Sequence, residues 1–192
     1  VLIILGSLLL GLPFPLLVSQ ILWINLVSDG LPNLALTMEP EEEDIMSKDY
    51  QEHNKELFGL EGKVLVGIIS IVTGLSTIFL FYYFWQKTGD QVLARTVTFT
   101  ALGIDTLFYV FSIRNLRENI FKSKPFRNIY LNFAILGGLL LQLMAIYLPF
   151  FNKFLNTVPL YWSEWSLILI FVFLVISMIE SIKYLFNRYY QY

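Results

Sequence analysis

The stretch that decides the fold is WINLVSDGLPNLAL, residues 23–36. Asn25, Ser28 and Asp29 stand in it at positions i, i+3 and i+4, so on a helix their side chains share one face. The surrounding residues are apolar, and a Gly-Leu-Pro sequence follows directly. An aspartate inside a membrane costs about 2.5–3.5 kcal/mol on insertion scales, so we expect this group to pair, to protonate or to bind something.

The composition of the whole chain indicates a membrane protein. Of its 192 residues, 56% are hydrophobic and only 15% are charged, with a mean hydropathy of +0.64. A soluble domain carries about 25% charged residues. The net charge of −2 does not favour nucleic acid as a partner. The absence of cysteine excludes disulfides, thiol nucleophiles and cysteine-based metal sites within the chain.

The apolar residues fall in blocks of about twenty, the length that a helix needs to cross a bilayer core. They predict an all-α, polytopic transmembrane helix bundle of about six membrane helices, the first of them incomplete. The predicted segments are 1–12, 16–36, 64–85, 91–113, 129–151 and 165–186. The first would be about 18 Å long, which is too short for a span. We therefore expect the chain to begin within a helix and to be a piece of a longer protein.

The charged and aromatic residues between the segments predict the orientation. Five basic residues lie in the loop 114–128, which is typical of the cytoplasmic side. The same side then holds the acidic stretch 39–63 and the C-terminus. Tyrosine and tryptophan gather at 82–85 and 161–165, as expected of an aromatic belt at the outer interface.

Two interpretations fit the polar cluster of the second segment. Asn25, Ser28 and Asp29 all offer oxygen, the ligand atom that hard cations such as Ca²⁺ prefer. Gly30 and Pro32 weaken the helix, and a break there would free backbone carbonyls for a cation site. The alternative is a cluster that joins helices through hydrogen bonds. The pattern favours the cation site.

The region 12–46 resembles the fifth-to-sixth helix hairpin of P-type cation-transporting ATPases, most closely the calcium-pump branch. The resemblance rests on Gly11-Leu12-Pro13, on residues 20–32 and on Asp44-Ile45-Met46, which match in order and spacing. It is weaker at 94–102 and 148–165. It implies that the cation-coordinating Asn, Thr and Asp of the family fall on Asn25, Ser28 and Asp29, with serine in place of threonine.

The resemblance also implies a division of the chain as the C-terminal transmembrane domain of such an ATPase. Residues 1–36 would form the ion-site hairpin, 37–63 a cytoplasmic loop and 64–192 four supporting helices. The transported ion would be Ca²⁺. The partners would be the lipid bilayer and the remaining helices and cytoplasmic domains of the same pump. The location would be multi-pass, in a plasma membrane or an internal calcium-store membrane.

The hydrolytic motifs of the family do not occur in this sequence. Neither the Asp-Lys-Thr-Gly-Thr phosphorylation motif nor a nucleotide-domain signature is present. ATP and Mg²⁺ would therefore act through domains absent from the chain, and we predict no catalytic or cofactor-binding residue here. Alone, the chain should be inactive, because it lacks these motifs. In addition, Asn25, Ser28 and Asp29 supply fewer than the six to eight oxygens that Ca²⁺ takes.

Two other functions stay open. The chain could be a freestanding scaffold or binding module with a pump-like fold but no transport, or part of a P-type pump for another cation such as Na⁺ or Mn²⁺. Among the remaining polar residues, we interpret Asp105 as a helix–helix hydrogen-bonding group. Glu180 and Lys183 should form a local ion pair. The small residues Ser70 and Gly74 should allow close helix packing, and the resemblance implies that the first segment is their partner.

Overall fold

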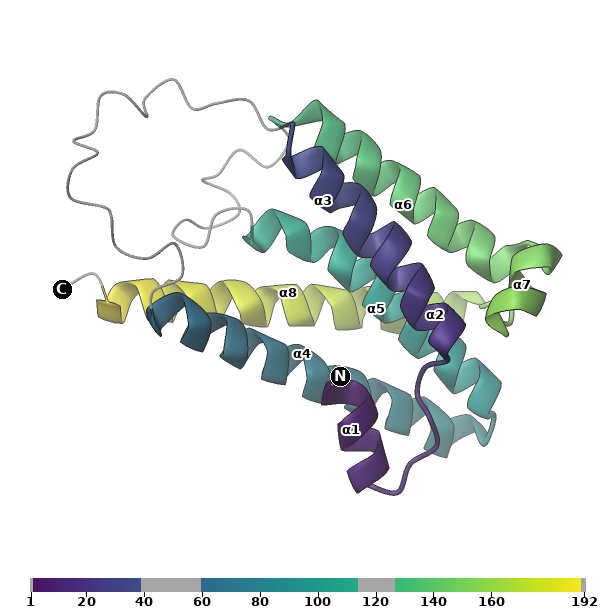
Figure 1. The fold of residues 1–192 in the computed structure, drawn as a ribbon. Coiled ribbons are helices and arrows are strands. Elements are labelled where there is room, and N and C mark those ends of the chain that lie inside the picture. The colour runs from purple at the N-terminus through teal and green to yellow at the C-terminus, as the bar shows by residue number, and fades with distance from the viewer. Residues whose placement is uncertain (1, 39–59, 114–126, 191–192) are drawn as a thin grey trace.

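The computed structural model describes residues 2–38, 60–113 and 127–190. Every regular element among them is helical, so the predicted all-α bundle is confirmed (Figure 1). The elements are α1 (Leu2–Leu9), α2 (Val18–Trp23), η1 (Ile24–Gly30), α3 (Leu31–Leu36), α4 (Leu60–Thr88), α5 (Gln91–Ile113), α6 (Ile129–Tyr147), α7 (Pro149–Leu155) and α8 (Trp162–Tyr190). The Asp44-Ile45-Met46 motif and most of the basic loop that set the predicted orientation lie outside the described residues.

Within the described ranges, three helices are long and apolar enough to cross a membrane. They are the segments Val66–Thr88 of α4, Ile129–Tyr147 of α6 and Trp162–Leu185 of α8. Large apolar side chains cover their outer faces: Phe79 and Phe133 are each 67% exposed, and Phe173 is 71% exposed. In water such surfaces would associate. They are the faces that a helix bundle turns toward lipid.

The helix α5 lies at the centre of the bundle (Figure 1). It packs against α4, α6, α8 and η1. Two of its buried threonines bond to their own helix: Thr98 and Thr100 are fully buried, and each hydroxyl donates to the carbonyl four residues earlier, at 2.8 and 2.7 Å. This helix therefore forms the core around which the others are arranged.

The crossing of α5 and α6 depends on a glycine. A Cβ on Gly138 would lie 2.6 Å from Cδ2 of Leu107, whose side chain is fully buried. We expect Gly138→Ala to destabilise the bundle by about 1–3 kcal/mol through overpacking. Thermal unfolding in detergent measures this effect. Gly137→Ala is the matched control, because nothing lies within 4 Å of its Cβ position; equal stability of the two variants would contradict the prediction.

The helix α6 ends earlier than predicted. We expected this segment to continue to residue 151, but it ends at Tyr147, and a separate helix, α7, begins at Pro149. Proline disfavours the helical conformation of the residue before it. Leu148 is accordingly extended, with ψ 126°. The chain turns there, and α7 folds back toward α2.

The packing of α1 on α4 confirms the role predicted for Gly74, whereas Ser70 is exposed. A Cβ on Gly74 would lie 3.4 Å from Cβ of Leu2, and one on Gly6 would lie 2.5 Å from Cδ1 of Ile78. Both helices therefore approach each other through glycines. The close approach holds α1 against one wall of the cavity described below.

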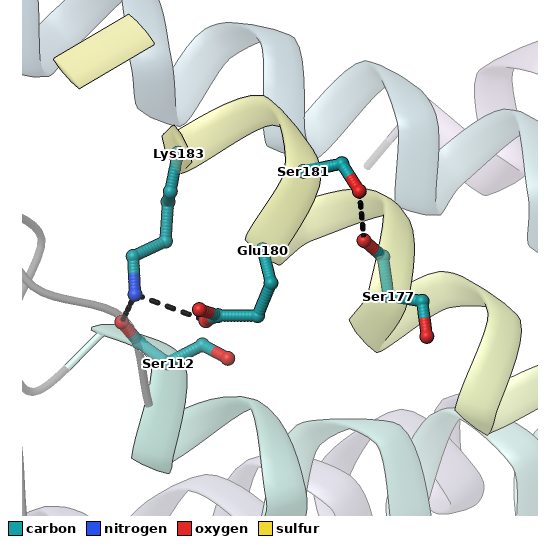
Figure 2. Close-up of polar contacts among 5 residues, drawn as sticks. All are labelled: Ser112, Ser177, Glu180, Ser181 and Lys183. Atoms are coloured by element: carbon teal, nitrogen blue, oxygen red, sulfur yellow. Dashed lines mark hydrogen bonds and ion pairs between the residues drawn. The ribbon is translucent and has the colours of Figure 1, made fainter. Parts of the chain in front are cut away.

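Near the end of α8, a buried lysine joins this helix to α5 (Figure 2). The Lys183 side chain is fully buried, and its Nζ donates to Oε1 of Glu180 at 3.0 Å, so the predicted local ion pair is confirmed. The same Nζ donates to the backbone oxygen of Ser112 at 2.8 Å. Ser112 lies in the last turn of α5, where carbonyl groups lack intrahelical donors. The lysine thus caps α5 as well as pairing with Glu180.

Candidate intramembrane cation site

The three candidate ligands lie on η1, a π-helical stretch between α2 and α3. The three elements form one continuous helix, since Trp23, Gly30 and Leu31 at their junctions all have right-handed helical dihedral angles. The predicted break at Gly30 and Pro32 is therefore wrong. The polar segment is a wide turn, not an unwound one.

The physical reason lies in how a π-helix distributes its hydrogen bonds. Pro32 has no amide hydrogen, so a carbonyl in the preceding turn loses its donor. A π-turn pairs each carbonyl with the amide five residues later, and single turns of this kind occur often at functional sites. Gly30 suits the wide turn, because the Asn25 carbonyl oxygen lies 3.3 Å from the place where its Cβ would be. The backbone widens ahead of the proline and stays helical.

The three candidate ligands occupy different environments. Ser28 is 1% exposed, and its Oγ has no hydrogen-bond partner among the described residues. Asp29 is partly buried and lines a cavity. Asn25 is exposed. Of the three, only Asp29 therefore reaches the cavity within this chain.

The cavity has a volume of about 520 Å³ and lies between α1, η1, α4 and α5. Its lining combines two carboxylates with four hydroxyls: Asp29, Asp105, Ser70, Thr73, Thr106 and Tyr109. The Thr106 hydroxyl donates to the Leu102 oxygen at 2.8 Å, so its lone pairs remain able to accept. Leu2, Ile3, Ile69, Gly74 and Leu102 complete the lining. It is rich in oxygen acceptors.

The environment of Asp105 differs from the one that the sequence predicted. We interpreted this residue as a helix–helix hydrogen-bonding group, but its Oδ1 is buried without a hydrogen-bond partner in the described part of the chain. The residue is only 4% exposed. It lines the same cavity as Asp29. One signal could have found it, since an ionisable residue within a membrane segment is a functional candidate by default.

The charged groups of the described lining all have the same sign. No lysine, arginine or histidine is among the described residues that line the cavity. Two carboxylates in a low-dielectric cavity are unfavourable unless a cation or a proton neutralises them. In the described ranges, no group of three or more acidic or histidine residues occurs that could hold a metal ion. The described lining offers two carboxylates and four hydroxyls, and oxygen atoms of this kind are the ligands that hard cations prefer.

The family described as "Cation transporting ATPase, C-terminus" matches residues 13–185. The chain belongs to this family. Together with the apolar helices, the match makes it part of an integral, multi-pass membrane protein, and it confirms the resemblance noted in the sequence.

Several relatives are named calcium-transporting ATPases. A "Calcium-transporting ATPase" of Bacillus subtilis is 34% identical over 88% of this chain. The "Endoplasmic reticulum calcium ATPase srcA" of Aspergillus fumigatus is 26% identical over 94% of it, and the human "Calcium-transporting ATPase type 2C member 1" is 33% identical over 78%. The matched regions are 19%, 22% and 16% of those proteins. The chain thus spans about a fifth of their length.

Proposed function

We propose that this chain is the transmembrane cation-transport domain of an ATP-driven calcium pump. One structural observation supports this most directly: Asp29 and Asp105 line one cavity, and no basic residue is among its described lining. Ca²⁺ is bound by oxygen ligands, and carboxylate and hydroxyl groups line this cavity. The relatives that are named calcium-transporting ATPases support the choice of ion.

In this proposal Asp29 is the principal charged ligand, and Asn25 and Ser28 add neutral oxygens. Asn25 is exposed in the described chain, although an exposed amide is costly in lipid. We propose that the remaining membrane helices of the pump cover it and complete the ligand shell. Residues 1–36 would then act as the ion-site hairpin, 37–63 as a cytoplasmic loop and 64–192 as the supporting helices.

The transport mechanism that we propose is coupled to domains outside this chain. ATP, with Mg²⁺, would phosphorylate a separate domain, and the resulting movement of helices would open the cavity first to one side of the membrane and then to the other. Within the chain, the residues at the cavity bind and release the ion. A ligand can shift such an equilibrium only as far as its affinities for the two states differ.

The test begins with the native polypeptide. Denaturing mass analysis from its source membrane should give a product several times larger than 22.3 kDa. Vesicles that contain this product should take up Ca²⁺ when ATP and Mg²⁺ are added. A product near 22.3 kDa would support a freestanding scaffold or binding module instead. Uptake of Na⁺ or Mn²⁺ without Ca²⁺ uptake would support a pump for another cation.

Asp105 gives a second test of the same cavity. We expect Asp105→Asn in the complete pump to weaken the apparent Ca²⁺ affinity about tenfold or more, because the cavity loses one of its two carboxylates. The measurement is the Ca²⁺ concentration that gives half-maximal phosphorylation from ATP. The conservative variant Asp105→Glu should recover part of the affinity. An unchanged Ca²⁺ dependence in Asp105→Asn would return this residue to the structural role that the sequence suggested.

A further inference from the structure

Two buried amide side chains join the ion-site helix, α2–η1–α3, to α6 and α7. The first is Gln20, in the first turn of α2. Its side chain is fully buried. Its Oε1 accepts a hydrogen bond from the Leu17 amide at 3.0 Å, which caps α2. Its Nε2 donates to the Leu155 carbonyl oxygen at 3.0 Å, at the last residue of α7.

The second amide, Asn128, repeats this arrangement at the opposite end. It is 1% exposed. Its Oδ1 accepts from the Leu131 amide at 3.1 Å, which caps α6. Its Nδ2 donates to the Ala35 carbonyl oxygen at 3.2 Å, in the last turn of α3. At each end, then, one side chain caps the start of one helix with its oxygen and binds the end of another with its nitrogen.

A third contact joins the same elements between these two ends. Trp23, the last residue of α2, donates from Nε1 to Oε1 of Gln142 on α6 at 3.2 Å. Gln142 is 1% exposed and fits against α5, where a Cβ on Gly103 would lie 2.9 Å from its Cδ. The Trp23 ring also makes an edge contact with Phe151 of α7, with 5.2 Å between the ring centroids. The ion-site helix is therefore bound to α6 and α7 at three places along its length.

We propose that Gln20, Trp23 and Asn128 are positioning residues that fix the ion-site helix against α6 and α7. The inference rests on the proposed function, since it assigns these residues to the calcium site. No bulk water is available in a bilayer core to replace a broken hydrogen bond, so sliding or tilting of this helix along α6 would leave carbonyls and amides unpaired. These contacts then set the position of Asp29 at the cavity in the conformation that the structure shows.

The most informative variant is Asn128→Ser in the complete pump. Serine is a good N-cap residue, so α6 keeps its cap, but the amide that binds the Ala35 oxygen is lost. The matched control is Asn33→Ser, because Asn33 is exposed on α3. A second variant, Gln20→Met, keeps the side-chain length and loses both hydrogen bonds, with the exposed Gln86→Met as its control. With two variants at different ends of the helix, the test remains possible if one of them fails to fold.

Two measurements test the positioning role of Gln20 and Asn128 separately from the proposed function. Hydrogen–deuterium exchange follows the amides of 31–38 for Asn128→Ser and of 18–23 for Gln20→Met. We expect exchange about five- to tenfold faster there than in the controls, the factor that corresponds to one lost hydrogen bond. The Ca²⁺ concentration for half-maximal phosphorylation from ATP should rise by a similar factor. The maximal phosphorylation at saturating Ca²⁺ should stay the same, because the ligands themselves are intact.

Each other outcome refutes one of the two claims. Unchanged exchange in both variants would show that the amides do not hold the helix. Faster exchange with unchanged Ca²⁺ dependence, or loss of maximal phosphorylation without a shift in Ca²⁺ dependence, would give the contacts a structural role only. A native protein whose phosphorylation does not depend on Ca²⁺ would refute the proposed function. The exchange data would still test whether Gln20 and Asn128 hold the helix.

Discussion

Replacing Asp29 by asparagine is expected to abolish Ca²⁺-dependent phosphorylation from ATP in the complete pump. The substitution keeps the shape of the side chain and removes its charge. Hydrogen bonds and ion contacts of an ionised group are about twice as strong as those of a neutral one, and the cavity holds only one other carboxylate, Asp105. A divalent ion would therefore lose half of the negative charge that this chain offers it in the cavity.

The measurement is phosphorylation from labelled ATP over a range of Ca²⁺ concentrations. Asp90→Asn is the matched control, because Asp90 is exposed and caps α5 through its Oδ1, which accepts from the Val92 amide at 2.8 Å. Asparagine caps helices as well as aspartate does, so this variant should behave like the native pump. Normal Ca²⁺ dependence of the Asp29→Asn variant would refute the assignment of the site.

Replacing Lys183 by methionine is expected to destabilise the bundle by about 2–4 kcal/mol, because a buried ion pair loses one partner and a buried carbonyl loses its donor. The lysine is fully buried and joins α8 to the last turn of α5 through Ser112. The Ca²⁺ dependence of the variant protein that remains folded should not change, since neither Lys183 nor Ser112 is among the described residues that line the cavity.

Thermal unfolding in detergent tests this prediction. At the size of this chain, each kcal/mol lowers the midpoint by about 2–4 °C. The exposed Lys153 provides the control Lys153→Met, which should leave the midpoint within about one degree, as expected of a surface substitution. The double variant Lys183→Met with Glu180→Gln measures the coupling of the pair. A midpoint for Lys183→Met equal to that of Lys153→Met would show that the buried contacts do not stabilise α5.

The sequence predicted the helices and the local ion pair correctly wherever the structure depends on one segment alone. The apolar blocks predicted helices close to the observed α4, α5 and α8, and the spacing of Glu180 and Lys183 predicted their ion pair. The reason is that hydrophobic periodicity and i, i+3 contacts are local. Pro149 carried the signal for the early end of α6, but the apolar run that continues past it concealed the turn.

The backbone around Asp29 could not be derived in the same way. Gly30 and Pro32 indicate that the regular α-helix is disturbed, but they do not decide between an unwound turn and a π-turn. Packing decides it: η1 lies against α5 and α6, with Val27 and Ser28 buried. A segment packed against two helices keeps its helical hydrogen bonds and widens.

By itself, the sequence determined that the chain is an α-helical membrane protein with a polar, oxygen-bearing segment in its second helix, because length, composition and spacing act within one segment. Only the tertiary structure decided which residues meet. It placed Asp105 beside the cavity that Asp29 lines, and it gave Gln20 and Asn128 their partners Leu155 and Ala35, which are 135 and 93 positions away. Contacts over such distances depend on how whole helices cross, and no local pattern in the sequence encodes the crossing.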